Sequence, residues 1–101
     1  MIGNCYFSKT HWIAELPQID VASQGETPRE AMDNLKDTIE GLIDSAYGER
    51  APVAVVDCRP AKAFCEGEGG PISVTCGSPP VWKEFVNMRR KQMGIEGPFD
   101  W

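Results

Sequence analysis

Carboxylates are the side chains of this sequence whose number and spacing could do chemistry. The chain holds 15 acids in 101 residues, and five recur every three or four positions: Glu30, Asp33, Asp37, Glu40 and Asp44. Acids that converge on two metal ions about 4 Å apart could bind Mg²⁺ and cleave a phosphodiester. On a helix, however, this spacing spreads the five acids over about 21 Å, at about 1.5 Å per residue. The spacing therefore does not predict a metal nuclease.

Other catalytic or metal-binding patterns are also missing from the sequence. There is a single histidine, His11, so a Ser-His-Asp or Cys-His arrangement has little to build on. The glycine-rich segment 66–70 carries acids that would repel a phosphate, so it is interpreted as a turn. The four cysteines lack the close C-x2-C spacing of zinc sites, and we expect free, largely structural thiols: Cys5, Cys58, Cys65 and Cys76. We expect no cofactor, no metal and no enzymatic activity.

The overall charge is concentrated in one half of the chain. Residues 1–50 carry nine acids and four bases, whereas residues 51–101 carry six of each, and this accounts for the formal net charge of −5. An acidic half argues against direct nucleic-acid binding by that half. No apolar run approaches the ~20 residues of a membrane span, and the N-terminus does not resemble an export signal. We expect one compact cytoplasmic domain with no membrane contact.

Three antiparallel strands are expected before the acidic segment. Residues 2–8 and 12–16 predict a β-hairpin with its turn near Ser8 to Thr10. Pro17 should end the second strand because it cannot donate to the ladder. The alternation of Ile19, Val21 and Ser23 with more polar residues predicts the third strand.

A capped amphipathic helix is expected over residues 28–47. Thr27 offers an N-cap hydroxyl, Pro28 stands at the first helical position and Glu30 completes a capping box. Gly48 is a plausible C-cap. The apolar face is predicted to hold Ala31, Leu35, Thr38, Ile39, Leu42 and Ala46. The five acids fall on the opposite side within about 80° of arc, and we call them the acidic face.

The second half of the chain predicts two further strands and a helix. A β-branched run indicates a strand over 53–57, and 72–75 alternates as another, with residues 60–65 as its possible hairpin partner. A helix is expected over 79–93 before an irregular tail, with an apolar stripe of Trp82, Phe85, Val86 and Met93.

Together these elements predict an α/β (α+β) fold. The expected sheet is small and mostly antiparallel, with ββ(β)αβ order, followed by a C-terminal strand or hairpin and a helix. We divide the chain into a core over 1–58 and a C-terminal extension over 59–101, packed on the same domain.

The acidic face has two interpretations. Most charged helix faces are simply solvated, but like charges at i,i+4 destabilise a helix by about 0.2–0.5 kcal/mol per pair. Because the sequence tolerates this repulsion, it favours the second interpretation, in which the acidic face is a binding surface for a basic protein partner.

The only basic cluster lies in the second helix and also has two interpretations. It consists of Lys83, Arg89, Arg90 and Lys91. These cations could contact a nucleic-acid backbone. The sequence favours the other interpretation, in which they stabilise the last turn of the helix through its dipole. The sequence leaves both open.

The run from Trp12 to Ser45 resembles the HicB-type antitoxins. The resemblance is carried by WIAELP at 12–17, QGETPREA at 24–31 and NLKDTIEGLI at 34–43. It implies a small, partly degraded ribonuclease-H-like domain that sequesters a small basic HicA-type RNA-cleaving toxin and does no chemistry itself. It also favours a homodimer or a higher oligomer.

Two alternatives to a toxin partner remain. Members of the family often end in a DNA-binding helix-turn-helix or ribbon-helix-helix. Residues 72–75 and 79–93 supply one ribbon and one helix, so promoter binding by an autoregulator is not predicted, although the helix keeps it as an alternative. The other alternative is a toxin-less HicB-like inhibitor of a nucleic-acid machine, such as a phage anti-defence protein, whose acids imitate a phosphate backbone.

Overall fold

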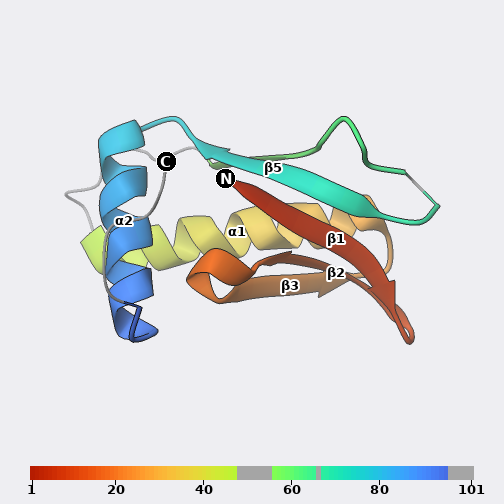
Figure 1. Cartoon of the computed structure of the whole chain (residues 1–101), viewed down its shortest axis with the longest axis horizontal. Coiled ribbons are helices and arrows are strands. Elements are labelled where there is room, and N and C mark those ends of the chain that lie inside the picture. Colours follow the sequence, from red (N-terminus) through yellow and green to blue (C-terminus); the bar gives the residue numbers. More distant parts are fainter. Residues whose placement is uncertain (48–55, 66, 96–101) are drawn as a thin grey trace.

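The computed structural model describes residues 1–47, 56–65 and 67–95 of the 101-residue chain. Within these ranges a five-stranded antiparallel sheet packs with two α-helices, which confirms the expected fold class (Figure 1). The elements are β1 (Ile2–Ser8), β2 (His11–Leu16), a 3-10 turn η1 (Pro17–Ile19), β3 (Val21–Gly25), α1 (Pro28–Tyr47), β4 (Val56–Pro60), β5 (Gly70–Cys76) and α2 (Pro79–Gln92).

The expected N-terminal hairpin is present, and the third strand starts later than predicted. β1 and β2 are joined at Lys9 and Thr10, and Lys9 takes a positive φ of 58°. Pro17 ends β2, but the chain then forms η1 in place of a strand, so the prediction that Ile19 lies in a strand is wrong. Asp20 follows in the left-handed conformation, at φ 52°, and redirects the chain into β3.

The start of α1 follows the predicted capping. The Glu30 backbone N–H donates to Thr27 Oγ1 at 3.1 Å, which satisfies one of the orphan donors of the first turn. Gly25 ends β3 directly beside this turn. A Cβ at Gly25 would stand 2.6 Å from the backbone nitrogen of Ala31, so a side chain here would push the strand and the helix apart.

The buried face of α1 is rotated from the predicted one. The residues it buries are Ala31, Met32, Leu35, Ile39 and Ile43. Thr38 and Ala46, which were expected on this face, are exposed. The buried residues 31, 35, 39 and 43 follow one another at intervals of four, and Leu42, which was expected on this face, is half-buried against the same core.

The sheet has the order β3-β2-β1-β5-β4. β5 lies between β1 and β4, so the strand that follows α1 does not pair with β1. β4 begins at Val56 among the described residues and runs to Pro60, while residues 53–55 of the predicted strand lie outside the described ranges. The described residues of the predicted core (1–58) and of the predicted C-terminal extension (59–101) therefore share one sheet and one hydrophobic core.

The second helix crosses one end of the domain (Figure 1). Trp82, Phe85 and Val86 are buried in the common core, as predicted. Met93 was expected in the same stripe but is 38% exposed, because α2 ends at Gln92 and Met93 is its C-cap. Gly94 then takes φ 81°, which ends the helix. The predicted C-cap Gly48 and the tail 96–101 lie outside the described residues.

No helix in the described ranges combines the length and the apolar character needed to cross a membrane.

Candidate functional site

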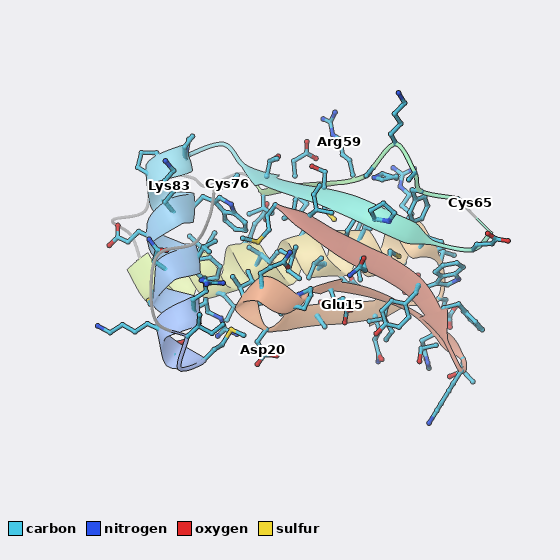
Figure 2. The ribbon with its side chains drawn as sticks, viewed as in Figure 1. Glu15, Asp20, Arg59, Cys65, Cys76 and Lys83 are labelled. Atoms are coloured by element: carbon cyan, nitrogen blue, oxygen red, sulfur yellow. The ribbon has the colours of Figure 1, made fainter. Side chains whose placement is uncertain are left out.

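Four of the five acids on the acidic face are exposed to solvent. They are Glu30, Asp33, Asp37 and Asp44. None of these four pairs with a cation among the described residues. The ion pair found between described residues joins Asp57 and Arg59 on β4 at 2.7 Å, and Figure 2 shows Arg59 projecting from the outside of the sheet. The prediction of an exposed run of acids on α1 is confirmed for these four residues.

Glu40 has a different role from the other four acids. Its Oε1 accepts a hydrogen bond from the Val56 backbone N–H at 3.1 Å, and the side chain is half-buried. The carboxylate thereby satisfies the first donor of β4, an edge strand. Glu40 thus ties α1 to the sheet, and its predicted contact with a partner stays a prediction.

The sheet curls so that α1 contacts both of its edge strands, β3 and β4. On the β3 side, the Asn34 side-chain Nδ2 donates to the Gln24 carbonyl at 2.8 Å. On the β4 side, Glu40 makes the contact described above. The acidic face is therefore the solvent side of a helix that is fixed at both flanks, which makes it a rigid surface.

The β4 edge offers few groups to a partner strand. The Val56 N–H points at Glu40 and therefore away from β5. Residues two apart on a strand direct their main-chain groups the same way, so the main-chain groups of Cys58 and Pro60 also point away from β5. Glu40 occupies the Val56 donor, and Pro60 has no N–H. Cys58 is left as the only open donor in this strand.

The β3 edge is more open. The Gln24 carbonyl faces outward to Asn34, so Ala22, two residues earlier, directs its N–H and C=O outward as well. No backbone partner is found for the Ala22 groups within the described ranges. Of the two edges that flank the acidic face, β3 is thus the one that an extended segment of another protein could join.

A pocket of about 540 Å³ opens where α1 begins, beside β4. Its lining residues are Thr27, Pro28, Arg29, Met32, Asp33, Cys58, Pro60 and Phe64. Burial raises the pKa of the Cys58 thiol to about 11, with smaller contributions from Cys5, Asp57 and Asp33. The thiol therefore stays protonated near neutral pH and is a poor nucleophile. Asp33 belongs to both the pocket and the acidic face.

The basic cluster of α2 is partly committed to the fold. Arg89 donates from Nε to the Ile19 carbonyl at 3.2 Å and from Nη2 to the Asp20 carbonyl at 3.1 Å. The Arg89 guanidinium thus fastens α2 to η1, and its contact with nucleic acid stays a prediction. Lys83 and Lys91 are exposed and Arg90 is half-buried. Figure 2 shows Lys83 on α2.

The cysteines do not form the cross-links or ligand sets of a catalytic centre. All four are free, as predicted, and Figure 2 places Cys65 and Cys76 near opposite ends of the domain. Burial raises the pKa of the Cys5 thiol, which lies in the core. Among the described residues, no group of three His, Cys, Asp or Glu side chains is placed to hold a metal ion.

Three features of this site were not foreseen: the contact of Glu40 with Val56, the contact of Arg89 with η1, and the pocket. All three join segments far apart in the sequence, so helical periodicity carried no signal for them. The terminal proline of β4 was the one local sign that this edge would be closed.

Comparisons with known proteins give no independent assignment. No family model, no curated protein and no solved structure matches this chain. The resemblance to HicB-type antitoxins, and the ribonuclease-H-like fold that it implies, stay predictions.

Proposed function

We propose that this protein is an antitoxin-like binding protein of the HicB type, which sequesters a small basic RNA-cleaving toxin in the cytoplasm. The acidic face of α1 and the adjoining β3 edge form the binding surface, and the protein does no chemistry. One observation carries the proposal: four exposed carboxylates follow one face of a single helix with no cation paired to them among the described residues.

The energetics of the isolated protein support this assignment. Asp33 and Asp37 stand at i,i+4, an arrangement that destabilises a helix by about 0.2–0.5 kcal/mol. A basic partner would replace this repulsion with attraction. Because the carboxylates are exposed, the attraction would act mainly on the rate of association and would be screened by salt.

The rigidity of the surface also supports protein binding. Contacts from Asn34 and Glu40 hold α1 at both edges of the sheet, so little conformational freedom would be lost on docking. At the β3 edge, the open main-chain groups of Ala22 could pair with an extended segment of the toxin.

The first test is to identify the partner. The neighbouring reading frames would be searched for a short basic protein, which would be co-expressed with this protein and purified by an affinity tag. We expect a stoichiometric complex in which the partner's ribonuclease activity is suppressed. The proposal would be contradicted by a neighbouring protein that does not bind this protein and does not cleave RNA. Capture of a larger nucleic-acid enzyme that DNA displaces would contradict it in favour of the inhibitor alternative.

A further inference from the structure

The pocket at the start of α1 lies beside the acidic face, and this position suggests how a partner would be recognised. Resting on the proposed function, we infer that the pocket receives one large apolar side chain of the basic partner. The docking segment of that partner then carries an aromatic or aliphatic anchor followed by cations that meet Asp37 and Asp44.

The lining of the pocket suits a neutral apolar side chain. Polar and apolar groups both line it, and five of its eight residues are apolar: Pro28, Met32, Cys58, Pro60 and Phe64. Its volume of about 540 Å³ is within the range of ligand pockets, about 300–1,000 Å³, and it exceeds the needs of one aromatic ring. Interface hot spots are commonly aromatic side chains seated in such pockets.

The charges at the pocket do not favour an ion inside it. Arg29 and Asp33 both line it and carry opposite charges, so together they leave its local charge near zero. The Cys58 thiol adds no charge near neutral pH. A neutral anchor would therefore meet no net charge repulsion in the pocket, while the cations of the partner would be drawn to the acids outside it.

The geometry of α1 sets the spacing of those cations. Asp33 lies at the pocket, and Asp37 and Asp44 follow it by four and eleven residues, or about 6 Å and about 16.5 Å along the helix. A partner helix running alongside α1 would match this spacing with its anchor at one position and cations four and eleven residues away. Charge complementarity and the shared residue Asp33 thus point to one continuous docking surface.

The test uses a designed probe, an alanine-based helical peptide with one Trp and with Lys four and eleven residues after it. Two control peptides replace the Trp by Ala or both Lys by Glu. Binding to the full chain would be followed by titration and by the backbone amide signals of Thr27, Cys58 and Phe64. We expect the Trp peptide to bind at least about tenfold more tightly than the Ala peptide, with shifts at these three amides.

Two variants at the pocket rim make the test specific. Arg29→Trp places a large ring beside the pocket, and Arg29→Ala removes the same charge without filling it. We expect Arg29→Trp to abolish the advantage of the Trp peptide and Arg29→Ala to keep it. Loss of the cation alone should strengthen the attraction for the lysines, so a loss of affinity in Arg29→Trp cannot come from charge.

The outcomes separate this inference from the proposed function. Equal binding of the Trp and Ala peptides overturns the anchor pocket but leaves docking by charge intact. Equal binding of the Lys and Glu peptides contradicts the proposed charge recognition itself. If N-acetyl-tryptophanamide binds as tightly as the Trp peptide, the pocket is an independent small-molecule site and the inference is overturned. No binding of the Trp–Lys peptide at millimolar concentration contradicts both.

Discussion

The two helices carry charge runs that look alike in the sequence but differ in the structure. On α1, four carboxylates are exposed and have no cation paired with them among the described residues. On α2, Arg89 is held by two backbone carbonyls of η1 and Asp20. The acidic run is a surface open to a partner, whereas part of the basic run maintains the fold.

The difference comes from what each helix faces. α2 packs against η1, where the backbone carbonyls of Ile19 and Asp20 accept hydrogen bonds from two N–H groups of the Arg89 guanidinium. Carboxylates only accept hydrogen bonds, and within the described part of the chain Glu40 alone among the five reaches a donor, the N–H of Val56. A run of like charges therefore stays open to a partner only where no complementary backbone lies within reach.

The largest stability effect is expected from removing the Arg89 anchor. Arg89→Met keeps an apolar stem but loses both charge-assisted hydrogen bonds, so the free energy of unfolding should fall by about 2 kcal/mol. Urea denaturation would measure it, with Lys91→Met as the control, expected within about 0.5 kcal/mol of the native protein. If Arg89→Met lost no more stability than Lys91→Met, the Arg89 hydrogen bonds would not hold the fold together and the contrast with α1 would disappear.

The next effect concerns pH and the pocket beside the acidic face. Because burial raises the Cys58 pKa from 9.0 to about 11, the folded state favours the protonated thiol. This contribution is fully present below pH 9 and is lost as the pH rises toward 11. The loss of this contribution should lower the free energy of unfolding by about 1 kcal/mol, which is less than the full pKa shift implies because the thiol is partly exposed. The same denaturation series on Cys58→Ala should lack this loss, and a matching loss there would contradict the assignment.

A similar loss is expected when the cap that orients the acidic face is removed. Thr27→Ala leaves the Glu30 N–H without its side-chain acceptor and should cost about 1 kcal/mol of unfolding free energy. Thr27→Ser keeps a hydroxyl and should change stability much less. Thermal denaturation of the two variants would reveal the difference, and identical melting curves would show that the cap is not needed.

The smallest expected change is an increase in the free energy of unfolding. Asp37→Lys removes repulsion with Asp33 and creates an i,i+4 pair of opposite charge, so it should raise the free energy of unfolding by about 0.5 kcal/mol. Glu84→Lys, at an exposed position of α2, is the matched control. If Asp37→Lys were clearly destabilising, the residue would have a structural contact, and the acidic face would resemble the basic cluster more than the structure indicates.

Local sequence signals predicted the elements but not the contacts that distinguish the two charge runs. The Thr27 cap, the hairpin turn and the buried positions Leu35 and Val74 follow from spacing within a few residues. η1 was missed because alternating residues after Pro17 imitate a strand.

The roles of Glu40 and Arg89 were not predictable from spacing. Glu40 bonds a residue 16 positions away, and Arg89 bonds carbonyls 69 and 70 positions away. These contacts depend on the curl of the sheet and on where α2 crosses it, which helical periodicity does not encode.

The most direct test of the central claim is the salt dependence of partner binding after charge reversal on α1. Asp37 and Asp44 would be changed to Lys together, leaving Glu40 because it supports β4. The control, Glu68→Lys with Glu84→Lys, makes the same change in net charge at exposed sites elsewhere. Affinity for the basic protein encoded beside this chain would be measured from about 0.05 to about 0.5 M salt. We predict that the α1 variant binds at least about tenfold more weakly at low salt, with a flatter salt dependence, while the control stays close to the native protein. Native affinity of the α1 variant at low salt would contradict the account.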